Sequence, residues 1–79
     1  DTDRAAIVHE TEEGAVVTLD LPDIDPTGLS AGIDSNVLLV ALDGEVLERV
    51  SLPRGDLEVN DASFNNGILD VRLRENTNE

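Results

Sequence analysis

Three residues in the first third of the chain have the types and spacing to do chemistry. Asp23, Asp25 and Thr27 form an Asp-x-Asp-x-Thr pattern directly after the apolar run of residues 15–21. A carboxylate at such a position can act as a nucleophile, and a second carboxylate two residues away can act as a general acid or base. The rest of the chain would have to supply the elements that position these groups and the other residues that the reaction needs.

The pattern resembles the active-site motif of haloacid-dehalogenase-type phosphatases, in which the first Asp is the nucleophile and the second is the acid/base. That resemblance implies a parallel α/β domain, a Lys that holds the phosphate and further acids for Mg²⁺. This chain has no Lys and shows no helical periodicity. Pro26 fixes its backbone angle beside Asp side chains that can accept backbone hydrogen bonds, which is typical of a turn. We therefore predict an acidic turn, no catalytic residue in the chain and no enzymatic activity.

The acidic residues also raise the question of metal binding. Asp20, Asp23 and Asp25 offer oxygen ligands for Ca²⁺ or Mg²⁺, but their spacing lacks the turn Gly and the distal Glu of an EF-hand loop. Cys is absent and His9 is the single His, so neither a zinc site nor a His-based relay is expected. The sequence predicts solvated surface acids, no metal site and no cofactor.

The strongest compositional signal is charge, with 18 Asp and Glu against five Arg and a net charge of −13. Nucleic acid is not an expected partner, because binding phosphate needs clustered cations. The acidity either serves a basic partner or adapts the chain to a salt-saturated cytoplasm, where self-repulsion is screened. The absence of Lys and the even spread of acids favour a halophilic, cytoplasmic protein. Arg49, Arg72 and Arg74 are expected to pair with acids on neighbouring strands.

Apolar and polar residues alternate along the chain with the period of β-strands, and no apolar stretch has the roughly 20 residues that span a membrane. We predict short strands at about 5–10, 15–21, 29–34, 37–42, 45–52, 57–60 and 68–73. Turn signals separate most of them: Glu13-Gly14, Ser35-Asn36, Asp43-Gly44, Pro53-Arg54-Gly55 and Asn66-Gly67. Residues 37–42 are apolar on both faces, as expected of a strand that a second sheet covers. Seven short strands in one small domain predict an all-β sandwich with a thin aliphatic core.

Several short motifs, in order and at workable spacings, resemble the α-crystallin domain of the Hsp20 small heat-shock proteins. They are Asp20-Leu21-Pro22, Asn36-Val37-Leu38, Leu52-Pro53, and Ala62 followed by Asn66-Gly67-Ile68-Leu69. The resemblance implies an Hsp20-like, immunoglobulin-type β-sandwich of about seven short antiparallel strands over residues 6–74. Residues 1–5 are then expected to be a disordered or trimmed segment, and residues 75–79 a polar tail.

The chain departs from this family in features that control assembly. Only Asp43-Gly44 separates the strands predicted at 37–42 and 45–52, where bacterial and plant members have a long loop that swaps a strand into a partner. The C-terminal I-x-I motif of the family is also absent, so we expect a monomer or a weak dimer. The short hairpin resembles domains appended to ArsA-type ATPases, CS/p23 co-chaperone domains, and the GvpH gas-vesicle proteins of haloarchaea. The Lys-free acidity favours the GvpH branch.

By this resemblance, a groove between residues 29–34 and 57–60 accepts an extended segment of a partner. The candidate groove residues are Leu29, Ala31, Ile33, Leu57 and Val59, with the alternative that these side chains only fill the core. The resemblance implies an ATP-independent chaperone or assembly factor that acts on protein clients, with gas-vesicle proteins as candidates and gas-vesicle association as the location. The alternative is a co-chaperone-like or appended interaction domain that binds one folded partner.

Overall fold

The computed structural model describes residues 6–76, which form seven β-strands and one short 3₁₀ helix. The elements are β1 Ala6–Glu10, β2 Gly14–Asp20, η1 Pro26–Gly28, β3 Leu29–Asp34, β4 Val37–Leu42, β5 Glu45–Ser51, β6 Leu57–Asn65 and β7 Ile68–Glu75. The predicted all-β class and the strand count are confirmed. The segment predicted at 1–5 and the end of the predicted tail at 77–79 lie outside the described residues, and Glu75 belongs to β7.

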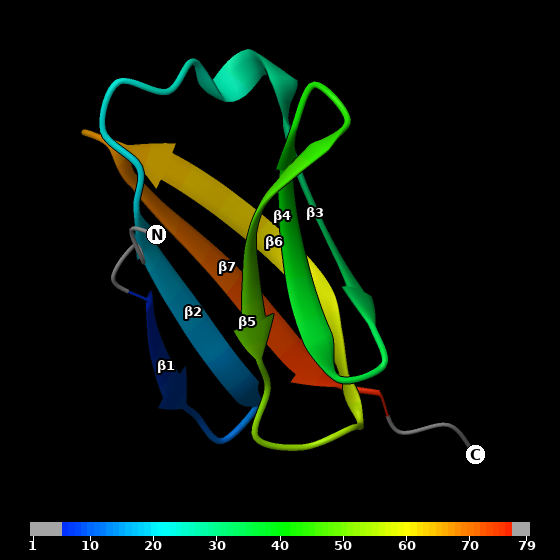
Figure 1. Cartoon of the computed structure of the whole chain (residues 1–79). Coiled ribbons are helices and arrows are strands. Elements are labelled where there is room, and N and C mark those ends of the chain that lie inside the picture. The colour runs from blue at the N-terminus through cyan, green and yellow to red at the C-terminus, as the bar shows by residue number, and fades with distance from the viewer. Residues whose placement is uncertain (1–5, 77–79) are drawn as a thin grey trace.

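The strands form two antiparallel sheets that face each other (Figure 1). Sheet A has the order β1-β2-β7-β6, and sheet B has the order β3-β4-β5. The inward side chains of both sheets make one aliphatic core, in which Val17, Leu19, Leu38, Val40 and Val71 are fully buried. No charged or polar side chain among the described residues is buried. The core is therefore held by apolar contact between the sheets, as the composition predicts.

Three of the predicted hairpin turns are confirmed. Ser35-Asn36, Asp43-Gly44 and Asn66-Gly67 each have positive φ at both central residues. This geometry matches the right-handed twist of the strands that the turns connect, and Asn, Asp and Gly tolerate it best. The two-residue turn at Asp43-Gly44 joins β4 directly to β5. The long loop of the strand-swapping family members is therefore absent from this fold.

The turn predicted at Glu13-Gly14 lies one residue earlier than expected. Gly14 is the first residue of β2, and the turn before it is closed by the Thr11 hydroxyl, which accepts a hydrogen bond from the Gly14 N–H at 3.0 Å. Gly14 is buried opposite Arg74 of β7. A Cβ added there would overlap the carbonyl oxygen of Leu73 and lie 2.7 Å from the Cα of Arg74. Glycine is needed at this position for the close approach of β2 and β7.

Candidate functional site

The candidate site lies where an edge strand of one sheet contacts an edge strand of the other. β3 borders sheet B, β6 borders sheet A, and the two strands are in contact (Figure 1). Within the described residues, β3 pairs only with β4, and β6 pairs only with β7. An edge strand leaves alternate backbone N–H and C=O groups without ladder partners. Either strand can therefore accept a further extended segment through its backbone.

Between β3 and β6 the surface sinks into an apolar depression of about 230 Å³. Its lining residues are Leu29, Ser30, Ala31, Val59, Ala62 and Leu69. A second depression of about 190 Å³ shares three of these residues and is lined by Pro26, Leu29, Ala62, Ser63, Phe64 and Leu69. We call the two depressions together the β3–β6 groove.

The structure places the five predicted groove residues in three different settings. Leu29, Ala31 and Val59 line the β3–β6 groove and also pack against the core. Ile33 is half-buried, packs against the core, and lines neither depression. Leu57 is only 7% exposed and is part of the core itself. Leu57 therefore fills the core, whereas a partner-binding role of the three lining residues stays a prediction.

The sequence prediction missed Ala62, Phe64 and Leu69, which line much of the groove. The predicted strand ended at residue 60, because simple alternation from Val59 would place Asp61 and Ser63 on the apolar face. In the structure, the register of β6 against β7 shifts between Val59 and Asp61. Asn60 is the extra residue of this β-bulge, and the bulge resets the alternation. Val59, Ala62 and Phe64 then share the inward face. The signal in the sequence was the alternation of Ala62 and Phe64, which resumes one residue later than expected.

The acidic turn that opened the question of catalysis is exposed and locally satisfied. Asp25 caps η1, and its carboxylate accepts a hydrogen bond from the Thr27 N–H at 3.0 Å. This hydrogen bond from the backbone holds the pKa of Asp25 below its usual value, with a smaller contribution from the Thr27 side chain. Asp23 has a positive φ and is exposed. Within residues 6–76, no three His, Cys, Asp or Glu side chains group around a possible metal position.

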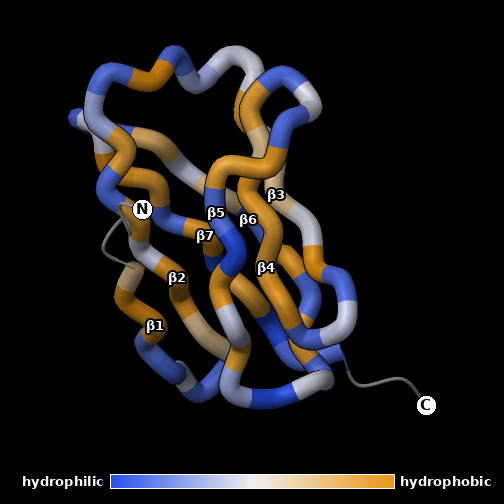
Figure 2. The backbone as a smooth tube through the Cα atoms, viewed as in Figure 1, coloured by the Kyte–Doolittle hydropathy of each residue, from blue (hydrophilic) through white to orange (hydrophobic). Residues whose placement is uncertain are grey.

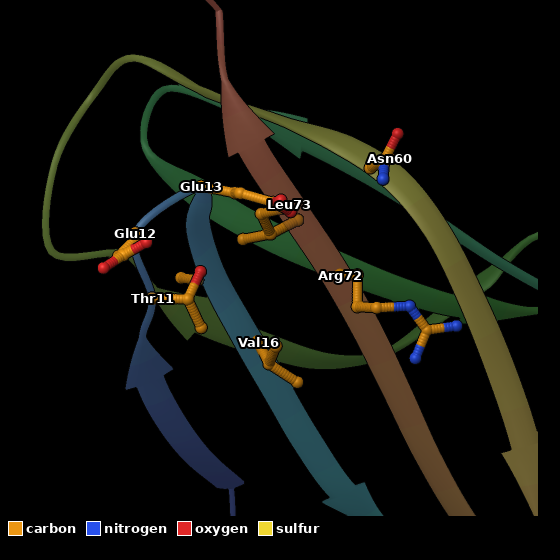
Figure 3. A pocket seen from close by; sticks show the side chains of 8 residues that line it. Thr11, Glu12, Glu13, Val16, Asn60, Arg72 and Leu73 are labelled. Atoms are coloured by element: carbon orange, nitrogen blue, oxygen red, sulfur yellow. The ribbon is translucent and has the colours of Figure 1, made fainter.

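A further depression, of about 330 Å³, lies on sheet A (Figure 3) and shares no lining residue with the β3–β6 groove. Thr11, Glu12 and Glu13 border one side, and Asn60 and Arg72 lie toward β6. The Arg72 guanidinium donates a hydrogen bond to the Asp61 carboxylate, and this bond raises the pKa of Arg72. Because Arg72 is already paired with Asp61, it is not an unpaired cation that could bind an anionic ligand. The lining residues also include no nucleophile with a base beside it, so this depression has no recognisable catalytic arrangement.

The arginines of β7 neutralise acids across the strand pair, as predicted. Arg72 pairs with Asp61, and Arg74 pairs with Glu58 at 2.6 Å, each directly opposite in the ladder of β6 and β7. Arg49 behaves differently, because its ladder neighbour on β4 is Leu39. Within residues 6–76, the prediction of a cross-strand acid partner is therefore confirmed for Arg72 and Arg74 and is wrong for Arg49.

Comparison with known proteins places this chain in a family. The model of the GvpH family matches residues 3–79, nearly the full length of the chain. The chain belongs to the GvpH family. Gas vesicle protein H1 of Halobacterium salinarum is 35% identical over 60 residues, which make up 73% of this chain and 33% of that relative. The matched segment of this GvpH chain thus spans about a third of the relative. No solved structure matches the chain.

The short hairpin between β4 and β5 resembled three groups of proteins: ArsA-associated domains, CS/p23 domains and GvpH proteins. Membership of the GvpH family selects the third. The predicted GvpH branch is confirmed, and kinship of this GvpH chain with the small heat-shock proteins stays a prediction. Residues 6–76 include no helix that is long and apolar enough to cross a membrane.

Proposed function

We propose that this GvpH chain is a non-catalytic, ATP-independent chaperone or assembly factor for gas-vesicle proteins. It holds extended apolar segments of these clients in the β3–β6 groove. The observation that carries the proposal is the apolar groove between two open sheet edges. The name of the relative, gas vesicle protein H1, supports the choice of client.

The composition of the groove suits strand addition. A client segment that pairs with the free edge of β3 or β6 gains backbone hydrogen bonds that do not depend on its sequence. Every second side chain of that segment then points toward the groove floor, because side chains alternate along a strand. Ala31 and Ala62 are small, which leaves room for a large aliphatic side chain above Leu69. The proposed specificity is therefore for extended segments with bulky apolar residues at alternate positions.

The charge of the chain supports the same role. A net charge of −13 keeps the protein and its complexes apart and in solution, since like-charged particles repel. At high ionic strength this repulsion is screened to a Debye length of about 3 Å at 1 M salt, so that a client can still approach closely. Acidic clients are then disfavoured at the groove only where their charges come within that distance.

One observation favours a second candidate function, a domain that recognises a single partner. The main depression of about 230 Å³ is small and holds only one or two side chains. Such a site suits one defined segment of a folded partner better than the many segments of unfolded clients. We keep this co-chaperone-like interaction domain as the alternative.

The test measures aggregation of a purified gas-vesicle protein by light scattering, in about 1 M KCl, with and without the chain. The wild-type chain is expected to suppress aggregation without ATP. Ala62→Glu, which puts a carboxylate into the groove at an exposed position, is expected to abolish suppression. Asn65→Glu, on the opposite face of β6 and also at an exposed position, is the matched control and should retain it.

The outcomes separate the alternatives. Failure of the wild-type chain to suppress aggregation would refute the chaperone function. Saturable binding of one folded gas-vesicle protein that Ala62→Glu removes, without any suppression, would support the single-partner domain. Equal suppression by both variants would show that clients do not use the β3–β6 groove.

A further inference from the structure

The outer face of sheet B is apolar and has no second layer over it among the described residues. β4 is the central strand of this sheet, and Figure 2 shows it as hydrophobic along its length. Leu38 and Val40 point into the core, whereas Val37, Leu39 and Ala41 alternate with them and point outward. Val46 of β5, directly opposite Ala41, is 41% exposed. The sequence predicted that a second sheet covers this strand; sheet A covers its inner face, and the outer face is also apolar.

A shallow depression of about 320 Å³ lies on this outer face, lined by Asp34, Val37, Leu39, Val46 and Arg49. Gly32 of β3 is the ladder neighbour of Leu39 on one side, and Arg49 of β5 is the neighbour on the other. A Cβ added at Gly32 would meet no atom within 4 Å. Sheet B therefore presents Leu39 as a partly exposed apolar residue with open space beside it on the β3 side.

The two charges on this face are uncompensated within the described residues. Three of the four arginines between residues 6 and 76 form ion pairs, namely Arg54, Arg72 and Arg74. Arg49 forms no ion pair with another described residue. Asp34 accepts a hydrogen bond from the Ser35 hydroxyl at 3.3 Å and has no cation beside it among these residues. One positive and one negative charge thus lie on opposite sides of an apolar stripe.

We propose that a second copy of this chain docks on this face, so that two outer faces of sheet B pack together about a two-fold axis parallel to β4. An isologous interface requires a self-complementary surface. This face meets the requirement, because its apolar stripe is central and its opposite charges lie to either side. Leu39 of each copy packs against Leu39 of the other, and Arg49 of each copy pairs with Asp34 of the other.

The ladder registers make this pairing geometrically consistent. Rotation about an axis along β4 places β3 of the second copy over β5 of the first. Arg49 then faces Gly32 of the second copy, where the missing side chain leaves room for a guanidinium. Asp34 of the second copy lies two residues beyond Gly32 on β3. At 3.4 Å per residue this is about 7 Å away, which is within reach of the Arg49 side chain of the first copy. A two-fold axis perpendicular to the strands would instead bring β3 over β3 and would not pair the charges.

The size of the face predicts a weak dimer. Three strands about 4.8 Å apart and six residues long present roughly 300 Å², against about 800 Å² per partner in standard interfaces. The net charge of −13 on each copy opposes association, although Asp34 and Arg49 leave this face neutral. Salt screens the overall repulsion between the two copies, so the dimer should tighten as ionic strength rises. The proposal does not depend on the function of the groove.

Sedimentation equilibrium of the full chain over a concentration series, in about 1 M KCl, tests this dimer. The wild type is expected to pass reversibly from monomer to dimer. Arg49→Asp alone and Asp34→Arg alone each put like charges together at both contacts, so each should raise the dissociation constant by about tenfold or more. Both positions are exposed, and the two variants should keep the circular dichroism spectrum of the wild type.

An equimolar mixture of the two variants provides the decisive measurement. In the mixed dimer, the carboxylate introduced by Arg49→Asp faces the guanidinium introduced by Asp34→Arg at one contact, and the native pair of Arg49 and Asp34 forms at the other. The mixture should therefore dimerise at least about tenfold more tightly than either variant alone. A wild type that stays monomeric up to about 1 mM, a range in which even weak contacts are populated, would overturn the proposal and leave the face to another protein. Single reversals without effect, or a mixture that does not recover, would overturn it as well.

Discussion

Substitution of two glycines by alanine tests how closely neighbouring strands approach each glycine. Gly14 and Gly32 both lie in strands and have no positive φ, so neither needs glycine for its backbone angle. At Gly14 the new Cβ overlaps backbone atoms of Leu73 and Arg74, which cannot move without opening the ladder of β2 and β7. At Gly32 the new Cβ meets no atom within 4 Å. The same substitution is therefore expected to lower the free energy of unfolding at Gly14 and to raise it at Gly32.

The magnitudes follow from the two settings. Overpacking against fixed atoms costs about 3 kcal/mol, at the upper end of its usual range, and the reduced entropy of the unfolded chain returns about 0.7 kcal/mol. Gly14→Ala should thus lose about 2 kcal/mol, out of the roughly 4–12 kcal/mol expected for a domain of this length. Gly32→Ala should gain about 0.5–1 kcal/mol.

Thermal unfolding followed by far-ultraviolet circular dichroism measures both variants, since the chain has no Trp or Tyr for fluorescence. For a domain of this size, Gly14→Ala should lower Tm by about 8–16 °C and Gly32→Ala should raise it by about 2–8 °C. Dilute samples keep the proposed dimer dissociated, so that Gly32→Ala reports the fold alone. Equal shifts of Tm, or a rise with Gly14→Ala, would refute the close approach of β2 and β7.

Three further predictions concern the bulge, the acidic turn and salt. Deleting Asn60 removes the extra residue of β6 but keeps Val59, Ala62 and Phe64 on one face, so this variant should still fold and suppress aggregation. Deleting Ser63 instead puts Ala62 and Phe64 on opposite faces and should destroy both folding and suppression. Equal behaviour of the two deletions would contradict the bulge. The pKa of Asp25 should lie below its usual value in an NMR titration of its carboxyl carbon and should return toward it in Thr27→Pro, which lacks the donating N–H. Since this pKa is lowered on folding, its contribution to stability is present above the usual pKa and is lost as the pH falls through the lowered value. Raising KCl from about 0.1 M to 1 M should raise Tm, because salt screens the repulsion within a chain of net charge −13. An uncharged osmolyte of equal osmolality, which does not screen charge, serves as the control. An unchanged Tm between the two KCl concentrations would contradict the halophilic adaptation.

Local signals predicted most of the fold because each operates within a few residues. Alternation fixed the strands, and the dipeptides Ser35-Asn36, Asp43-Gly44 and Asn66-Gly67 fixed the turns, since positive φ at two successive positions restricts the residue types. The bounds of β3 and β4 agree with the prediction at both ends. These elements need no knowledge of what lies next to them in space.

The features that the sequence did not predict depend on contacts between distant parts of the chain. Gly14 was assigned to a turn because nothing near it in the sequence indicates that Leu73 of β7 passes over it. Ala62 and Phe64 were missed as groove residues because a bulge shifts the phase of β6 by a single residue. Leu69 of β7 was missed because it lines the groove only through the contact of β3 with β6, which are distant in the sequence. Arg49 was assigned an acid partner because arginines in an acidic chain usually find one, and the register placed Leu39 beside it instead.

The two proposed binding surfaces share a strand without sharing side chains. Leu29 and Ala31 of β3 point toward the groove, whereas Gly32 and Asp34 lie on the outer face of sheet B. Because neighbouring residues of a strand face opposite ways, a dimer formed through the outer faces would leave both of its grooves open. Ala62→Glu should therefore remove client binding and leave the dimer intact, and Arg49→Asp should weaken the dimer and leave each groove functional. If one substitution removed both properties, the surfaces would not be independent, and the two-sided use of β3 would be wrong.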